Sequence, residues 1–223
     1  MEVAPILKSL PVAKIRELEK KAKDLGLEEK ILIENASSNL FRIINDLGLG
    51  KSVLVVAGRG NNGADVLSCA RKLSGCGYNV KVVILEEKEL GKEMVYQKTI
   101  LQKLKLPVYS IKQKNIYELR ELCEDRDFIL EGILGIGVKG RVSPFLEEAI
   151  TLINDSGKKI ISCDIPSGLS PDEGIPQGAA IKADYTITFL ALKQGFLGEG
   201  RKLCGKIFVV DIGISREALE NLS

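Results

Sequence analysis

The strongest constraint on the fold is a strand-like apolar run at residues 53–57, which leads through a glycine-rich turn into a helical pattern. Gly58, Gly60 and Gly63 in this turn form G-x-G-x-x-G. A strand, such a turn and a helix N-terminus are typical of nucleotide-phosphate sites, because glycine permits close approach to the backbone and N–H groups face the anion. The motif alone is weak evidence, since a tight structural turn has the same pattern.

Three polar side chains in this turn exceed what phosphate binding requires. Asn61 and Asn62 stand side by side, and Asp65 follows three residues later. The position of Asp65 is explained by the favourable interaction of a carboxylate with the first turn of a helix. The two adjacent asparagines have no such explanation, so we expect the turn to bind a ligand with more polar groups than phosphate alone.

Helical patterns and apolar runs alternate along the chain. One helix is predicted to start at Pro11 and end at Gly26, and a second covers residues 31–47. Most later apolar runs are continuous, which is typical of strands buried on both faces of a parallel sheet. The pattern predicts a single domain over residues 1–223 with an α/β fold. We expect a three-layer α/β/α sandwich with a Rossmann-like, mostly parallel sheet, and the helices of residues 1–50 should pack on this core. Strands are expected at 53–57, 80–85, 108–111, 128–130, 160–163, 185–189 and 207–210, and further helices at 64–75, 90–104, 116–123 and 144–154.

The composition excludes several classes of function. The 223 residues include no histidine, which removes Ser-His-Asp catalysis and histidine metal sites, so acid–base chemistry falls to other side chains. A net charge of +2 with interspersed signs predicts no nucleic-acid partner, and no apolar run is long enough to predict a membrane partner. Five scattered cysteines, and an N-terminus without the order of a signal peptide, predict a cytoplasmic protein with reduced thiols.

Two further polar loops are predicted at the edge of the sheet where strands end and ligands bind. In the loop 131–141, Gly135, Gly137 and Gly140 permit close approach to the backbone, and the basic residues Lys139 and Arg141 could meet phosphate charge. A flexible connection with a solvated basic pair is an equally good alternative. Glu131 directly follows an apolar strand, and a carboxylate in such a place is expected to be paired or to act as a ligand.

The third loop, 163–169, reads C-D-I-P-S-G-L. Asp164 ends a buried strand, and Ser167 can direct its hydroxyl into the crevice. The alternatives are that Asp164 caps a turn and that Ser167 satisfies backbone groups. Lys193 is a candidate for the rim of the crevice, although a solvated lysine is the commoner case. Asn35 is expected to cap or cross-link the second helix.

Several stretches together resemble the YjeF N-terminal domain, the NAD(P)H-hydrate epimerase family: GRGNNGAD, DIPSGL, KADYTITFLALKQG, and ENAS at 34–37, which is similar to the family's ENAG. The resemblance covers nearly the whole chain, to the closing VVDIGI. It implies a Rossmann-like fold, a homodimer, a bound potassium ion and interconversion of the R and S forms of hydrated NADH and NADPH. These damaged cofactors carry a hydroxyl at C6 of the nicotinamide ring. The implied functional partner is a separate dehydratase that consumes the S form.

The resemblance also implies roles for single residues. Inverting a carbon that bears a hydroxyl beside the ring nitrogen requires a C–O or C–N bond to break and re-form, and a carboxylate can take and return the proton. Asp164 is the expected catalytic residue, with Asp65 as the alternative. Potassium contacts are implied for Asn62, Glu131 and Ser167, and substrate contacts for Asn61, Asn62, Gly63, Ala64, Asp65, Gly135, Ile136, Gly137, Val138, Lys139, Gly140, Arg141 and Asp164.

The chain departs from the family pattern at a few positions. Ala64 and Val66 replace glycines, so the methyl group of Ala64 is expected to narrow the approach to the backbone. Glu131 replaces an aspartate, which lengthens a potassium ligand by one methylene group.

Two other functions remain in competition. One is a non-catalytic nucleotide-binding or scaffold module of the same fold. The other is a dehydrogenase. It is disfavoured because it would need a histidine or a Tyr-x-x-x-Lys pair as hydride-transfer partner, and the sequence contains neither.

Overall fold

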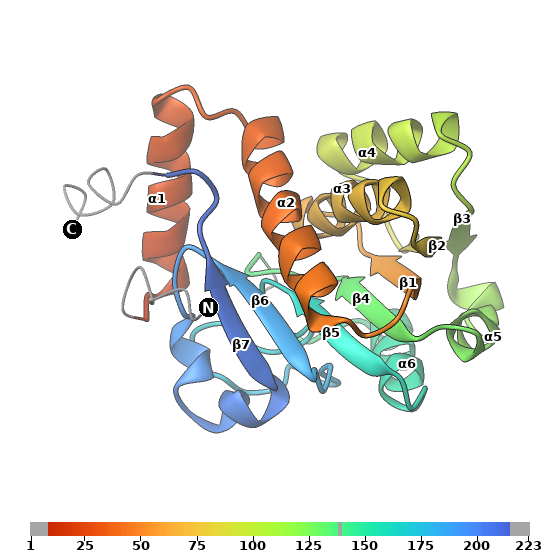
Figure 1. Ribbon diagram of the computed structural model, residues 1–223. Helices are drawn as coiled ribbons and strands as arrows, with labels where there is room; N and C mark the ends of the chain where they lie inside the picture. Colours follow the sequence, from red (N-terminus) through yellow and green to blue (C-terminus); the bar gives the residue numbers. More distant parts are fainter. Residues whose placement is uncertain (1–8, 138–139, 215–223) are drawn as a thin grey trace.

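A computed structural model describes residues 9–137 and 140–214 (Figure 1). Its seven-stranded sheet has the order β3-β2-β1-β4-β5-β6-β7, and every neighbouring pair is parallel. The strands are β1 (Ser52–Ala57), β2 (Asn79–Leu85), β3 (Val108–Ile111), β4 (Phe128–Gly132), β5 (Lys159–Cys163), β6 (Tyr185–Phe189) and β7 (Lys206–Val210). The helices are α1 (Val12–Asp24), α2 (Glu29–Leu47), α3 (Asn61–Gly75), α4 (Lys92–Lys103), α5 (Glu118–Glu124) and α6 (Pro144–Asn154), with 3₁₀ turns η1 (Gln113–Asn115), η2 (Gln194–Phe196) and η3 (Glu199–Leu203).

Helices cover both faces of the sheet, and alternate strand residues supply the two cores. Val53 and Val55 of β1 pack in one cluster with residues of α1, α2, α3 and α4. Leu54 and Val56 point to the opposite face, where residues of α5 and α6 meet them. In Figure 1, α1 to α4 lie above the sheet and α5 and α6 below it. The predicted three-layer α/β/α sandwich with a parallel sheet is therefore confirmed.

The strand order determines where a ligand can bind. The chain enters the sheet at β1, runs outward to β3, and returns to β4 on the other side of β1. Loops that leave two neighbouring strands at such a reversal diverge and leave a crevice between them. The register pairs Val56 with Glu131 and Glu131 with Ser162, so the carboxyl ends of β1, β4 and β5 lie level. Residues from the three polar loops line one cavity there, as the sequence predicted.

Element boundaries differ from the predicted ones in two places that matter for the site. Helix α3 begins at Asn61 rather than at residue 64, because extended Gly60 (φ −99°, ψ −167°) is its N-cap. Strand β4 continues to Gly132, so Glu131 lies inside the strand and not beyond it. The helix predicted at 116–123 is α5, which begins two residues later and ends one residue later, and η1 precedes it.

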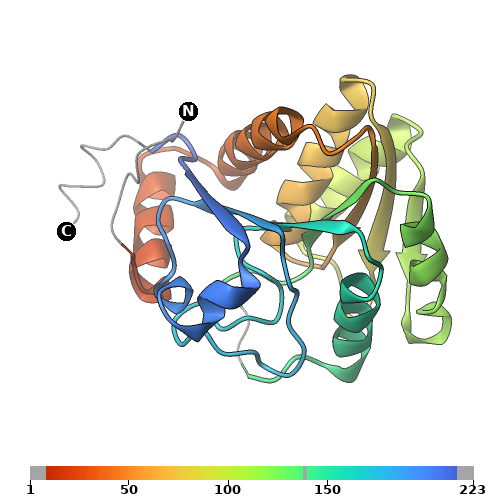
Figure 2. The same cartoon turned by 60° about the horizontal axis from the view of Figure 1, so that its bottom comes forward.

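The beginning of α1 is attached to the segment just before η2. Leu10 forms a parallel bridge with Lys193, and its N–H donates to the carbonyl of Leu192 at 2.8 Å. The N–H of Val12 donates to Asp172 Oδ1 at 2.8 Å. Figure 2 shows α1, in red, beside this blue segment. These bonds hold α1 near the carboxyl ends of the strands, so that its side chains reach the crevice.

Candidate functional site

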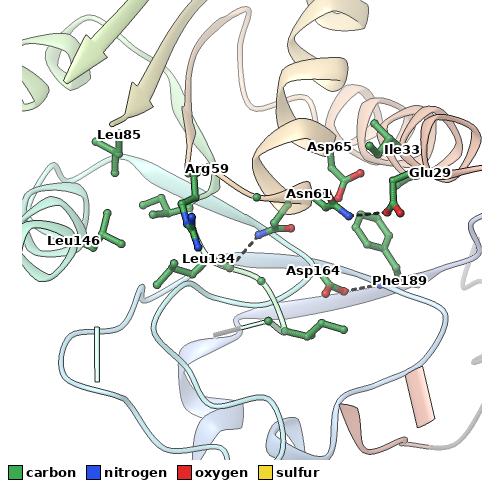
Figure 3. Close-up of a pocket in the computed structure, with 18 of the residues that line it drawn as sticks. Glu29, Ile33, Arg59, Asn61, Asp65, Leu85, Leu134, Leu146, Asp164 and Phe189 are labelled. Carbon is green, nitrogen blue, oxygen red and sulfur yellow. Dashed lines mark hydrogen bonds between the residues drawn. The ribbon is translucent and has the colours of Figure 1, made fainter. Parts of the chain in front are cut away.

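A cavity of about 600 Å³ lies at the carboxyl ends of β1, β4 and β5 (Figure 3). Its volume is within the range of pockets that bury a small-molecule ligand. Three of its walls are the N-terminus of α3, the loop after β4 and the turn after β5, and α1 and α2 supply side chains to a fourth. Its lining residues include Arg16, Glu19, Glu29, Ile33, Arg59, Asn61, Asn62, Asp65, Leu85, Lys88, Leu134, Gly135, Ile136, Gly137, Arg141, Leu146, Asp164 and Phe189.

The glycines of the first turn serve both packing and ligand approach. A Cβ atom on Gly58 would lie 1.8 Å from the carbonyl oxygen of Ile133, and one on Gly63 would lie 2.2 Å from the carbonyl oxygen of Gly58. At these two positions one backbone segment lies so close to another that only glycine, which has no Cβ atom, fits. Gly60 has nothing within 4 Å of its Cβ position and lines the cavity. The first-turn N–H groups of α3, which lack partners within the helix itself, begin beside it and suit an anion.

The two adjacent asparagines connect the N-terminus of α3 to its surroundings. Asn61 Nδ2 donates to Glu29 Oε1 of α2 at 2.6 Å. Asn62 Nδ2 donates to the carbonyl oxygen of Leu134, in the loop after β4, at 3.0 Å. Both residues also line the cavity. Their polarity, which phosphate binding does not require, thus orients two walls of the crevice relative to the helix.

Asp164 lies at the end of β5 in a backbone conformation that is rare for residues other than glycine, with φ of +63°. Such strain persists where the surroundings enforce it, and it is common at functional sites. Its Oδ1 accepts hydrogen bonds from the N–H of Phe189 at 3.1 Å, from Thr188 Oγ1 at 3.2 Å and from Lys193 Nζ. All three donors favour the ionised carboxylate, which faces the cavity.

Lys193 is buried, contrary to the expectation of a rim or solvated lysine. Its side chain is 1% exposed, and its ammonium group donates to Asp164, to Thr188 Oγ1 at 2.8 Å and to the Phe189 carbonyl at 3.1 Å. These three bonds use the three donors of an ammonium group. A buried cation requires such pairing, and here it holds a negative charge on Asp164 inside the crevice.

Asp65 extends from the second turn of α3 into the cavity, where Figure 3 shows it near Asp164 and Glu29. Burial first, and then the charges of Asp164, Glu19 and Glu29, raise the pKa of Asp65 well above its ordinary value. The pKa of Glu19 is also raised, by burial and then by the charge of Asp164. The crevice therefore has an acidic end and, around Arg59, a basic end.

Glu131 is fully buried below the crevice and does not line it. One carboxylate oxygen accepts from Ser162 Oγ at 2.5 Å and the N–H of Ser167 at 3.1 Å. The other accepts from Ser167 Oγ at 2.5 Å and the N–H of Ile133 at 3.2 Å. Burial raises the pKa of Glu131, and these four bonds oppose that effect. Of the two roles expected for this carboxylate, being paired or acting as a ligand, the structure shows the first.

The three predicted potassium contacts meet around the backbone of Leu134. Asn62 donates to its carbonyl, and Ser167 Oγ lies 2.8 Å from its nitrogen and 3.2 Å from its oxygen. Glu131 joins the group through Ser167. Amide, hydroxyl, carboxylate and carbonyl oxygens together suit a hard cation. Among the described residues, no cluster of three or more His, Cys, Asp or Glu side chains could hold a metal ion.

Most of the predicted substrate contacts lie on the cavity wall, and a few do not. The structure brings together Asn61, Asn62, Asp65, Gly135, Ile136, Gly137, Arg141 and Asp164. Gly63 and Ala64 are buried within α3, and the methyl group of Ala64 packs in the core. The expectation that this methyl group narrows the approach to the site is therefore wrong. Gly140 is absent from the lining, and Val138 and Lys139 lie outside the described residues.

Several cavity residues had no signal in the local sequence. Arg16 and Glu19 come from α1, and Glu29 from α2, which the sequence marked as helices for packing. Arg16 Nη2 donates to the carbonyl of Ile136 at 3.2 Å and so joins α1 to the loop after β4. Phe189 at the end of β6 lies next to Asp164 in Figure 3. Arg16, Glu19 and Glu29 reach the cavity because α1 and α2 fold over the edge of the sheet.

Two remaining expectations concern residues outside the crevice. Asn35 Nδ2 donates to the carbonyl of Ile212 at 2.8 Å, which confirms that it cross-links α2, here to the segment after β7. A search of the described helices for one long and apolar enough to cross a bilayer found no candidate.

Comparison with known proteins gives consistent matches. Residues 29–195 match the family model described as YjeF-related protein N-terminus. The chain is 34% identical to the NAD(P)H-hydrate epimerase of Elusimicrobium minutum, over 97% of this chain and 100% of that protein. It is 32% identical to the NAD(P)H-hydrate epimerase of Nitrosopumilus maritimus, over 96% and 99%.

Two further matches concern a longer relative and a solved structure. The bifunctional NAD(P)H-hydrate repair enzyme of Thermofilum pendens is 33% identical over 96% of this chain, which spans 42% of that protein. A yeast protein of known crystal structure superimposes with a TM-score of 0.82, covering 97% of this chain and 94% of that one at 24% identity. The superposition supports the fold described above.

Proposed function

The chain belongs to the YjeF-related N-terminal family, and from that membership we propose that it is an NAD(P)H-hydrate epimerase. It is an isomerase that interconverts the R and S epimers of hydrated NADH and NADPH. The observation that carries the proposal is Asp164, an aspartate that is paired with a buried lysine and faces a cavity at the nucleotide-binding edge of the sheet. A carboxylate so placed can take a proton from the C6 hydroxyl of the hydrate and return it.

The cavity accommodates a hydrated dinucleotide in one orientation better than in the reverse. The pyrophosphate belongs at the N-terminus of α3, where unpaired N–H groups and the helix dipole favour negative charge. Figure 3 shows Arg59, Leu85 and Leu146 on one side of this point and Asp164 and Phe189 on the other. The hydrated ring belongs beside Asp164, and the adenosine half beside Leu85, since the acidic end would repel phosphate.

The experiment that tests the function uses racemic hydrated NADH and a dehydratase specific for the S form. The dehydratase alone consumes the S half, and the R half then disappears at its spontaneous rate. Adding this protein is expected to let the R half be consumed rapidly as well. If the R half persists at its spontaneous rate while the hydrate still binds, the protein is the alternative, a non-catalytic nucleotide-binding module of the same fold.

We also propose that potassium binds where Asn62, Glu131 and Ser167 surround the backbone of Leu134. The oxygen set supports this site, and Glu131 would exchange some of its present hydrogen bonds for contact with the ion. When bound, potassium would supply positive charge that orders the phosphate groups at the end of α3. These residues otherwise hold the loop after β4 in place.

Potassium is expected to stabilise the protein selectively. Replacing sodium chloride by potassium chloride at constant ionic strength should raise Tm, because a ligand at 100 times its Kd stabilises the folded state by about 2.7 kcal/mol. Ser167→Ala should abolish this difference, while Ser38→Ala, an exposed serine on α2, should retain it. Equal Tm values for the unsubstituted protein in both salts would contradict the potassium proposal and leave the epimerase proposal intact.

The cellular setting is the last part of the proposal. All five cysteines are free thiols, and four are buried, which supports residence in the reducing cytoplasm. A separate S-specific dehydratase is the expected functional partner, and the likeness to a bifunctional NAD(P)H-hydrate repair enzyme supports a second repair activity that acts on the same hydrates. We expect a homodimer, and sedimentation equilibrium would measure its mass.

A further inference from the structure

Asp65 is buried in the crevice with no partner for its carboxylate. Asp65 is 8% exposed, and it lies on the cavity wall beside the end of β5. Among residues 9–137 and 140–214, no hydrogen bond or ion pair reaches either carboxylate oxygen. A buried and ionised carboxylate normally has donors around it, so this arrangement suits the neutral acid.

The charged groups that face Asp65 also favour the neutral form. Glu19 of α1, Glu29 of α2 and Asp164 after β5 are all acidic, and each opposes ionisation of Asp65. The nearby cations are already engaged, since Lys23 pairs with Glu29 and Lys193 pairs with Asp164. The thiols of Cys69 and Cys163, which also face Asp65, are neutral because burial raises the pKa of each.

Asp164 has the opposite surroundings in the same cavity. It accepts three hydrogen bonds, one of them from a buried ammonium group. One wall of the crevice therefore presents a carboxyl group surrounded by hydrogen-bond donors, and the next presents a carboxyl group that has no donor among the described residues and faces other acids. Titratable pairs whose environments differ in this way commonly divide the base and acid roles of a reaction between them.

We propose that Asp65 is a second catalytic residue, the general acid that acts together with Asp164 as the base. The inference rests on the epimerase function proposed above. Asp164 removes the proton from the C6 hydroxyl, the C6–N1 bond breaks, its electron pair goes to N1, and N1 takes the proton of Asp65. The product of this step is an open-chain aldehyde with a secondary amine.

Ring closure reverses the proton transfers. Rotation about the C5–C6 bond presents the other face of the aldehyde, N1 attacks C6, Asp65 regains its proton from N1, and Asp164 returns its proton to the oxygen. Atoms and charges balance without a co-reactant, and both aspartates finish in their starting states. The same pair can therefore act in either direction, as an epimerase requires.

Asp65→Asn tests the inference because asparagine keeps the shape but cannot transfer a proton. We expect kcat to fall by about 10²–10⁴-fold, with KM within threefold of the unsubstituted value. In the unsubstituted protein, kcat should decline as pH rises through the raised pKa of Asp65. Asp46→Asn, a matched change at an exposed position of α2, should leave both parameters unchanged.

Stability distinguishes a catalytic role from a structural one. A carboxyl whose pKa is raised by folding contributes stability below its unfolded pKa and loses it as pH rises through the folded pKa. Asp65→Asn should therefore increase the free energy of unfolding relative to the unsubstituted protein, and the increase should grow from pH 5 to pH 8. Activity would thus fall while stability rises.

Three outcomes separate the two proposals. If the unsubstituted protein does not accelerate consumption of the R epimer, the function itself is wrong. If it does and Asp65→Asn retains kcat within threefold, Asp65 is not the acid. A loss of kcat accompanied by a loss of stability at pH 8 would also overturn the inference, because it would assign Asp65 a structural role.

Discussion

Replacing Asp164 with asparagine is expected to lower kcat for epimerisation by about 10²–10⁴-fold. The amide cannot take the proton of the C6 hydroxyl, although its Oδ1 can still accept the bonds that Phe189 and Thr188 donate. Asparagine is chosen over alanine because it tolerates the positive φ of this position. Consumption of the R epimer in the presence of excess S-specific dehydratase measures the effect.

Binding of the hydrate should survive this substitution. Most of the cavity wall is unchanged, so KM is expected to remain within about threefold, and circular dichroism at the assay temperature controls for folding. The same assay on Asp46→Asn provides the matched exposed change. A kcat of Asp164→Asn close to that of the unsubstituted protein would show that the base lies elsewhere.

Lys193→Met is expected to cost about 3–5 kcal/mol in the free energy of unfolding. Methionine fills a similar volume, but Asp164 then remains in the crevice wall without its cation, and the Phe189 carbonyl loses a donor. The substitution should also lower kcat, because the ammonium group holds the carboxylate charged and oriented. Urea denaturation at pH 7 measures the first effect and the coupled assay the second.

A double-mutant cycle separates the ion pair from the packing of Lys193. Asp164→Asn alone leaves the buried ammonium without its counter-ion, so it should destabilise the protein as well. The double variant Asp164→Asn/Lys193→Met removes both charges and should be more stable than the sum of the single effects by roughly 0.5–3 kcal/mol. Additive effects would mean that the two side chains contribute independently and that Lys193 does not position Asp164.

The sequence predicted the fold better than the site. Continuous apolar runs that alternate with helical patterns can form few architectures other than a parallel sheet covered by helices. The predicted ends of the strands agree with the observed ends to within one or two residues. The N-terminus of α3 was placed three residues late, because Asn61 and Asn62 look like loop residues until Gly60 is seen as the N-cap. The three loops converge as expected, since the carboxyl ends of parallel strands share one edge.

A site residue could be predicted where its neighbours in the sequence form a recognisable pattern. Asp164 follows a buried strand directly, so its position at the sheet edge could be read from its neighbours in sequence. Lys193 could not be assigned in this way, because a lysine in a loop is usually solvated and its partner lies 29 positions away. Glu19 and Glu29 gave no signal, since amphipathic helices carry acidic residues on their exposed faces as a matter of course.

The sequence by itself determined the layers, the strand–turn–helix at the nucleotide edge and the aspartate that faces the crevice, because each depends on periodicity or on adjacent residues. Only the tertiary structure decided which groups surround the two carboxyl groups of that crevice. Whether a carboxylate is charged depends on burial and on partners distant in the chain, and these differ completely between Asp164, paired with Lys193, and Asp65, buried among other acids. Long-range packing thus assigns different chemistry to two side chains of the same type.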